Sequence, residues 1–323
     1  MNLQTKIPLK PQTHNQIDYH ANVLLLGSCF VENIGQKLDY FKFRNLQNPF
    51  GILFHPLAIQ NLISNAVTKK VYKEEDVFFH NEQWHSFEAH SVLSNTSKTA
   101  LLDELNAQIQ FTRNQIESAS HIIITLGTAW VYRDIESTTV VANCHKVPQK
   151  KFSKELLSVT DILKSLQVFI QHIKSVNQSA NIIFTVSPIR HLKDGFIENT
   201  QSKAHLITAI HALLNEKASP NKGQLYYFPS YEIMMDELRD YRFYADDMIH
   251  LNQTAIHYIW NAFKRVWVSD DALKTMDEVD AIQRGLQHKP FNSNSEAHQL
   301  FLKKLSEKKV KLETSFPHIS FKF

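Results

Sequence analysis

A hydroxyl and a thiol follow an apolar run near the start of the chain. Residues 23–26 are all apolar, as in a strand covered on both faces, and Gly27 permits a sharp turn. Ser28 and Cys29 come next, at the start of a segment with helical periodicity. The field of a helix N-terminus favours a thiolate, so the segment predicts a nucleophile. The alternative is a buried cysteine that packs as a small hydrophobe.

A second group of reactive side chains lies far along the chain. Asp247 and His250 form a D-x-x-H sequence just before a helical segment that begins near Asn252. Such a turn can aim both side chains at one point, where the imidazole accepts a proton and the carboxylate fixes its tautomer. The alternative is that Asn252 caps the helix and His250 is an exposed loop residue. The pair follows the last predicted strand, which favours the catalytic interpretation.

Apolar runs and the helical segments between them must position these groups. Each run ends in a turn, and the predicted strands are residues 23–27, 121–127, 182–186 and 225–228. Helical spacing covers residues 31–43, 57–67, 98–116, 153–176, 202–217 and 252–267. This alternation predicts an α/β fold, a three-layer sandwich with a mostly parallel sheet. Both reactive groups would then lie at the carboxyl edge of the sheet.

Insertions and a C-terminal extension complete the predicted architecture. Residues 77–87 are typical of an inserted hairpin around Asn81 and Glu82, and residues 138–143 favour another short strand. Two surface helices are predicted at 270–288 and 293–312, and the apolar segment 316–323 is expected to dock on the protein. We therefore expect a catalytic domain over residues 20–268 and a helical C-terminal extension over residues 269–323.

Composition narrows the possible partners and the compartment. The formal net charge of +3 over 323 residues is too small to indicate binding to nucleic acid or to a membrane surface. No apolar segment is long enough to cross a bilayer, and residues 1–19 lack the apolar core of a signal peptide. The only two cysteines are Cys29 and Cys144, which favours a reduced compartment and hence the cytoplasm. The oligomeric state stays open.

No metal or cofactor is expected, although the chain has 17 histidines. His80, His85 and His90 recur every five residues, which matches neither one helix face nor one strand face, and no HExxH or paired CxxC occurs. No glycine-rich phosphate loop or dinucleotide fingerprint follows a strand. A metal-dependent hydrolase that uses some of these histidines therefore ranks well behind a nucleophilic enzyme.

Several ordered blocks of the sequence resemble the GSCFA-domain family, which is placed in the wider SGNH/GDSL hydrolase-like superfamily. The segment Gly27-Ser28-Cys29-Phe30-Val31 is close to the motif that names the family. Further similar blocks are residues 48–51, 126–130, 143–148, 186–190 and 231–250, so the similarity spans about residues 20 to 265. The resemblance implies an SGNH-hydrolase-like sandwich. It also implies an acyl hydrolase or acyltransferase that acts on an ester of a carbohydrate or other small metabolite.

The catalytic residues of SGNH enzymes carry over at two blocks. These enzymes use a Ser in block one, and the resemblance puts Cys29 at that position and Ser28 one residue before it. Cys29 is therefore the expected nucleophile, and Ser28 is the alternative. Block five, which carries an Asp and a His, survives as Asp247 and His250. A cysteine nucleophile forms a thioester, which makes acyl transfer as credible as hydrolysis.

The oxyanion donors of the superfamily carry over less well. Gly51 matches the glycine of block two, so its N–H could join that of Cys29 in stabilising an oxyanion. Ala129 stands where block three carries an Asn, and loss of one such donor costs about 10²–10³ in rate in other enzymes. Thr128 or Asn48 would have to replace it. The absence of the block-three Asn also supports the main alternative function, a non-catalytic ligand-binding module that retains the fold.

Other residues are candidates for substrate contact. Arg190 and His191 follow the strand 182–186 and are expected at the rim of the site, where Arg190 could hold a carboxylate or phosphate or form a surface ion pair. His145 could form part of a substrate wall, although it and Cys144 should point to opposite faces of a strand. Four aromatic residues could line a sugar-binding wall, with core packing as the default for each: Trp84, Trp130, Tyr132 and Tyr244.

Overall fold

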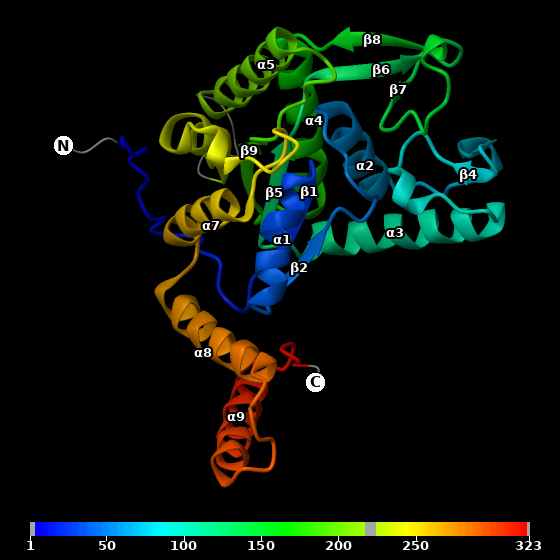
Figure 1. The fold of residues 1–323 in the computed structure, drawn as a ribbon. Helices are drawn as coiled ribbons and strands as arrows, with labels where there is room; N and C mark the ends of the chain where they lie inside the picture. The colour runs from blue at the N-terminus through cyan, green and yellow to red at the C-terminus, as the bar shows by residue number, and fades with distance from the viewer. Residues whose placement is uncertain (1–3, 217–223, 322–323) are drawn as a thin grey trace.

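A parallel sheet forms the centre of the molecule, a computed structural model in which residues 4–216 and 224–321 are described (Figure 1). Within these residues, five strands lie in the order β10-β9-β5-β1-β2, and all neighbours are parallel. Their bounds are β1 (Asn22–Gly27), β2 (Arg44–Gln47), β5 (His121–Leu126), β9 (Asn181–Val186) and β10 (Leu225–Tyr227). Four of them match the predicted strands. The short, polar edge strand β2 was not predicted.

The central strands are buried on both faces, as their predominantly apolar sequences indicate. All six residues of β5 and of β9 are buried. Alternate side chains of a strand point to opposite faces, so Leu24 and Ile122 belong to one hydrophobic core while Leu25 and Ile123 belong to the other. A sheet of this kind is stable only when helices cover both faces.

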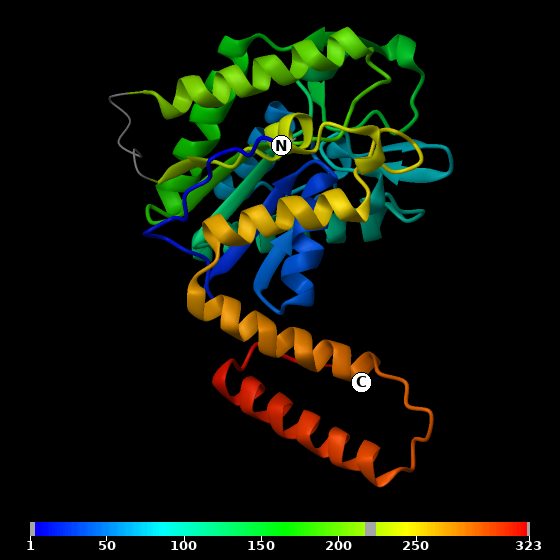
Figure 2. The same ribbon diagram turned by 60° about the vertical axis from the view of Figure 1, so that its left-hand side comes forward.

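Helices cover the sheet on both sides (Figures 1 and 2). The core on the Leu24 face includes residues of α2 (Pro56–Thr68), α3 (Lys98–Ser118), α4 (Val159–Val176) and α5 (Phe196–Leu214). The core on the Leu25 face includes residues of α1 (Phe30–Tyr40), α7 (Gln253–Trp267) and the π-helical turn η4 (Ile233–Leu238). The short helix α6 (Ser230–Glu232) directly precedes η4 and contributes no residue to this core. The predicted three-layer α/β sandwich is confirmed. The predicted helix 202–217 begins earlier, at Phe196, and its predicted end at Lys217 lies outside the described residues.

The predicted inserted hairpin is also present. Strands β3 (Phe78–His80) and β4 (Gln83–His85) pair in antiparallel fashion. The two turn residues, Asn81 and Glu82, have φ values of 45° and 61°. Two consecutive left-handed residues are what a two-residue hairpin turn needs to match the twist of its strands.

A small antiparallel sheet follows β5 and corrects one helix prediction. Its strands lie in the order β7-β6-β8, with bounds β6 (Trp130–Asp134), β7 (Val140–Val141) and β8 (Phe152–Leu156). Strand β7 falls within the predicted strand 138–143. The helix predicted from residue 153 starts only at Val159, because Ser158 caps it in a capping box with Asp161. The residues before the cap pair with β6 instead.

Two C-terminal helices project from the sandwich, as Figure 2 shows. Helix α8 (Asp270–Gln287) buries one face, and α9 (Glu296–Ser315) contacts it, with Leu305 packed against Gly285. The tail docks as predicted, with Ile319 and Phe321 buried; residues 322–323 lie outside the described residues. In the part of the chain that the structure describes, no helix combines the length and hydropathy needed to span a membrane.

Candidate functional site

Loops after the strands of the central sheet meet at one cavity of about 340 Å³, which we call the Cys29 cavity. Each strand is followed by at least one residue of its walls: Cys29 follows β1, Phe54 follows β2, Thr128 follows β5, residues 189–194 follow β9, and His250 follows β10. Strand β1 lies where the strand order reverses, since β2 is on one side of it and β5 on the other. Ligands of open α/β sheets bind at such a reversal, outside the carboxyl ends of the strands.

The turn after β1 is held by its neighbours on both sides. Gly27 has φ +138°, and a Cβ there would lie 2.1 Å from the carbonyl oxygen of Thr125, so only glycine fits. The Gly27 N–H donates to Asn48 Oδ1 at 2.9 Å, and the Ser28 N–H donates to the Thr125 carbonyl at 3.0 Å. These bonds to β5 and to the loop after β2 fix where the next residue, Cys29, lies.

The structure separates the two candidate nucleophiles. Ser28 is 1% exposed, and its Oγ is buried with no hydrogen-bond partner among the described residues. Cys29 is half-buried, is the N-cap residue of α1, and lines the cavity. Only the thiol of this pair is therefore positioned to meet a ligand in the cavity.

The thiol of Cys29 is not pre-ionised, contrary to the expectation from the helix N-terminus. Burial raises its pKa, and the carboxylate of Glu32, one turn along α1, raises it further. The backbone N–H groups of Cys29 and Phe30 and the charge of Lys203 lower the pKa without reversing the shift. The thiol therefore needs a base to accept its proton during attack.

Asp247 and His250 form the pair that the D-x-x-H sequence predicts. Asp247 Oδ2 lies 2.6 Å from His250 Nδ1, while Oδ1 accepts the N–H groups of Ile249 and His250, each at 2.9 Å. These bonds lower the pKa of Asp247 to about 2. With Nδ1–H donating to Asp247, Nε2 is left as an acceptor. His250 lines the same cavity as Cys29, although no hydrogen bond joins the two within the described ranges. Such bonds are often long before substrate binds.

Two expected oxyanion donors are occupied by bonds within the fold. The Gly51 N–H donates to the Asn48 carbonyl at 2.7 Å, and Gly51 packs against His90 away from the cavity lining. Thr128 does line the cavity, but its hydroxyl bonds to Ser202 Oγ at 2.9 Å and accepts the Trp130 N–H at 3.1 Å. Both arrangements argue against the role that the family resemblance implied.

Asn48 also has a structural role, and its side chain is not placed to donate a hydrogen bond to an oxyanion. Its Oδ1 accepts the Gly27 N–H, and its Nδ2 is buried without a partner among residues that the structure describes. It is not part of the lining of the Cys29 cavity. In contrast, the Cys29 N–H donates to no backbone carbonyl within the described part of the chain. It stays the one expected donor that is available to a ligand.

His191 is a cavity residue to which the sequence assigned no role. Its Nε2 is buried and has no hydrogen-bond partner among the described residues, and a Cβ on Gly127 would lie 3.2 Å from it. The Asn199 side chain accepts the His191 N–H at 2.9 Å and so anchors the loop. Burial, with smaller contributions from Lys203 and His250, lowers the pKa of His191 to about 3. The ring is therefore neutral and can donate one N–H to a ligand.

Lys203 is a residue near the site that the sequence did not single out. This α5 side chain is 1% exposed, and its Nζ donates to the carbonyls of Gly127 at 2.6 Å and of Ser187 at 2.7 Å. It therefore ties together the loops that follow β5 and β9, and within residues 4–216 and 224–321 no carboxylate pairs with it. Burial lowers its pKa to about 7. Its position in a helical apolar pattern gave no signal of this role.

Arg190 and His145 have different surroundings. Arg190 lines the cavity, stacks over Tyr244 at 4.2 Å and Tyr241 at 5.1 Å, and forms no ion pair among the described residues, so the surface ion pair is not found. His145 is buried, with Nε2 2.8 Å from the Ser86 carbonyl, and it does not line the cavity. The expected substrate-wall role of His145 is therefore not supported.

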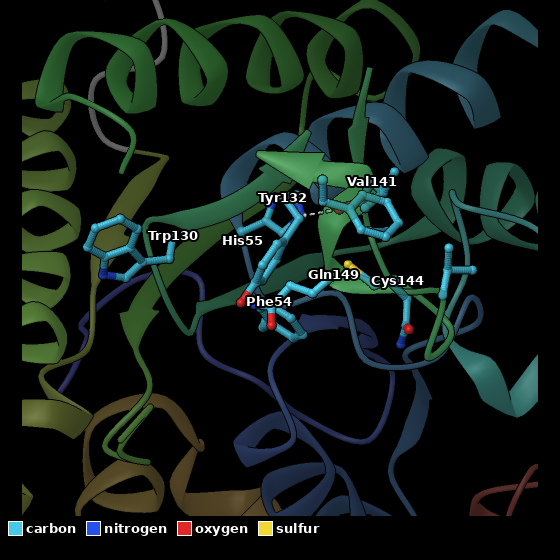
Figure 3. Close-up of a pocket in the computed structure, with 11 residues that line it drawn as sticks. Phe54, His55, Trp130, Tyr132, Val141, Cys144 and Gln149 are labelled. Carbon is cyan, nitrogen blue, oxygen red and sulfur yellow. Dashed lines mark hydrogen bonds between the residues drawn. The ribbon is translucent and has the colours of Figure 1, made fainter. Parts of the chain in front are cut away.

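The four aromatic candidates divide between a pocket wall and packing. Trp130 and Tyr132 line both the Cys29 cavity and a second pocket beside it (Figure 3). Tyr244 is buried against Arg190, and Trp84 lies under the ammonium of Lys98 on the hairpin. No group of three or more His, Cys, Asp or Glu side chains in the described ranges is arranged to hold a metal ion.

Comparisons with known proteins show the family to which the chain belongs. The model of the GSCFA family matches residues 22–263, and that of the GSCFA domain protein, C-terminal domain, matches residues 279–323. No curated protein matches the chain. The crystal structure of an acetyl esterase mutant with acetate ion is 9% identical with a TM-score of 0.36, over 80% of this chain and 99% of its own. A carbohydrate esterase family 3 from Talaromyces cellulolyticus is 9% identical with a TM-score of 0.35, over 81% and 99%. Because the first family model spans the chain from β1 into α7, this protein belongs to the GSCFA family.

Proposed function

We propose that this protein is an SGNH-like acyl hydrolase or acyltransferase that attacks an ester through Cys29. The observation that carries the proposal is the shared cavity: Cys29 and His250 open onto it, and Asp247 holds the imidazole at 2.6 Å. The substrate is an ester of a carbohydrate or another small metabolite. A nucleophile after the first strand and its base after the last strand meet because parallel strands end at one edge.

The reaction begins with attack of the Cys29 sulfur on the ester carbonyl carbon. His250 Nε2 accepts the thiol proton, which is necessary because burial and Glu32 keep the thiol protonated. Asp247 stabilises the imidazolium that results. The carbonyl oxygen becomes an oxyanion, with the Cys29 N–H and the neutral His191 ring as its donors.

The second half of the reaction releases both products. The C–O bond breaks, the alcohol leaves with the proton from His250, and the acyl group stays on Cys29 as a thioester. His250 then accepts a proton from water or from an acceptor hydroxyl, which attacks the thioester. The sulfur leaves and regains the proton. Water gives hydrolysis, and an alcohol gives acyl transfer.

A non-catalytic binding module is the second candidate. It is favoured by the bonds that occupy the Gly51 N–H and the Thr128 hydroxyl, which leave fewer oxyanion donors than an SGNH enzyme has. In this case the cavity binds an ester or a related ligand without turnover.

Intact-mass measurement after incubation with p-nitrophenyl acetate distinguishes the two candidates. We expect one acetyl group on Cys29 in the wild type and in Cys144→Ser, and none in Cys29→Ala. His250→Ala should acquire the adduct much more slowly. An unmodified wild-type protein, or an adduct found on Cys144, would favour the binding module.

A further inference from the structure

A second pocket, of about 320 Å³, adjoins the Cys29 cavity. The two share Phe54, Trp130 and Tyr132, so a ligand that enters one can extend into the other. The other walls come from His55, at the N-terminus of α2, and from β7, the following loop and the start of β8. Figure 3 labels His55, Val141, Cys144 and Gln149 among them. We call it the aromatic pocket; its remaining lining residues are His55, Val141, Ala142, Asn143, Cys144, Val147, Gln149 and Phe152.

The walls of the aromatic pocket carry no formal charge. Among the described residues that line it, none is Asp, Glu, Lys or Arg. Its histidine, His55, uses both ring nitrogens within the fold: Nδ1 accepts the Ala58 N–H, and Nε2 lies 3.1 Å from the Val141 carbonyl. Burial lowers the pKa of His55 to about 4, so the ring is neutral. A charged ligand group would lose its hydration here without gaining a partner.

Neutral hydrogen-bonding groups interrupt the apolar wall. The Tyr132 hydroxyl and the Gln149 amide form no hydrogen bond with any residue that the structure describes. The Asn143 Oδ1 accepts the His145 N–H, which leaves its NH₂ group for a ligand. Trp130 donates its indole N–H to the Glu198 carbonyl, so it offers a ring face and not a donor.

We infer that the aromatic pocket binds the alcohol part of the ester as an uncharged ring that carries hydroxyl groups. This inference rests on the proposed function, since it places the ester carbonyl at Cys29. Aromatic faces pack against the apolar face of such a ring, while amide and phenol groups bond its hydroxyls. An aliphatic chain would leave those polar groups unpaired, at a cost in affinity.

A substitution at the mouth of the pocket tests the inference with little risk to folding. Gln149 is exposed, so Gln149→Trp should fold and fill the pocket, and the exposed neighbour Lys150, which does not line the pocket, gives the matched control Lys150→Trp. The substrates are a mono-acetylated methyl glucoside, the same acetate ester of methyl glucuronide, and vinyl acetate, whose alcohol part has no ring to enter the pocket. Gln149→Trp should lower kcat/KM for the glucoside about tenfold and leave that for vinyl acetate within about twofold.

Two further outcomes follow from the same set of substrates. The control variant should change neither rate, and the wild type should prefer the neutral glucoside to the glucuronide. Equal loss on the glucoside and on vinyl acetate would overturn the inference. So would no loss on either, or equal turnover of the neutral and charged sugars.

Cys144 provides a second measurement that does not depend on turnover. Its thiol lines the aromatic pocket, and burial raises its pKa to about 11, so labelling is slow and easily followed. In Cys29→Ala, methyl glucoside should slow maleimide labelling of Cys144, and methyl glucuronide should not. If the wild type is never acylated but Cys144 is protected, the proposed function fails and the pocket assignment stands. Acylation of Cys29 without protection of Cys144 would overturn the inference alone.

Discussion

The Cys29 cavity and the aromatic pocket share three side chains but differ in charge. The first is lined by several charged or titratable groups, among them Arg190, Asp194 and His250, whereas the second has none that ionises near neutrality. Each contains a thiol whose pKa is raised by burial. His250 lines the Cys29 cavity and does not line the aromatic pocket. Because burial raises the pKa of both thiols, a difference in their reactivity would have to come from the other groups that line each cavity.

The difference follows from the elements that build each region. The Cys29 cavity lies at strand ends of the central sheet, where loops bring polar side chains together. The aromatic pocket lies against the small sheet β7-β6-β8, whose side chains alternate between a core face and a pocket face.

The largest expected effect comes from removing one thiol and not the other. Cys29→Ala should lower turnover of an activated ester by about 10³-fold or more, because the covalent step is lost. Cys144→Ser, the matched change in the neutral pocket, should stay within about twofold of the wild type. Steady-state rates measure both. Equal losses in the two variants would break the contrast between the regions.

The next effect concerns the proton acceptor. His250→Ala should lower kcat by about 10²–10⁴-fold, because the variant lacks the imidazole that accepts the thiol proton in the proposed reaction. Since hydrogen bonds hold the pKa of Asp247 at about 2, its carboxylate is ionised throughout the working range, and no rate change near neutrality should report its titration. Asp247→Asn should therefore reduce the rate at every pH. Pre-steady-state acylation measured against pH checks this, and an unaffected Asp247→Asn protein would contradict it.

A smaller effect is expected at the unpartnered imidazole. His191→Ala should lower kcat about 10²-fold with little change in KM, because one donor to the oxyanion is lost. His191→Gln, which retains an N–H donor, should recover part of the rate. Alkylation of Cys29 by iodoacetamide needs no oxyanion donor, so its rate should be unchanged in both variants. A parallel fall in alkylation would indicate a structural role instead.

The smallest effect is on stability and has a defined sign with pH. Burial lowers the pKa of Lys203 from 10.5 to about 7, so the unfolded chain binds more protons than the folded chain between these values. The free energy of unfolding of the wild type should therefore rise with pH over that window, relative to Lys203→Met, by up to about 1.4 kcal/mol per pH unit. Below pH 7 the two curves should run parallel. Urea denaturation across the window tests this, and parallel curves throughout would contradict it.

Local patterns determined much of the fold. The runs that became β1, β5 and β9 are mostly apolar, as expected of strands covered on both faces, and Asn81 with Glu82 marked the hairpin turn. Strand β2 was missed because it is short, polar and at the sheet edge. Strand β8 was missed because its residues continue an apparent helical pattern, and only pairing with β6 makes them a strand.

For the site, the sequence by itself determined the motifs, and the tertiary structure decided which groups are available. The turn around Gly27 and the Asp247–His250 pair are local, and the sequence predicted the pair from its spacing together with its place after the last predicted strand. The hydrogen bonds of the Gly51 N–H and the Thr128 hydroxyl, the place of His191 in the cavity wall, and the bonds of the buried Lys203 to two loops all depend on contacts between elements that only the fold brings together. Whether a donor is already hydrogen-bonded, and whether a side chain is buried, depends on the residues packed around it. The spacing of residues along the sequence does not specify those neighbours.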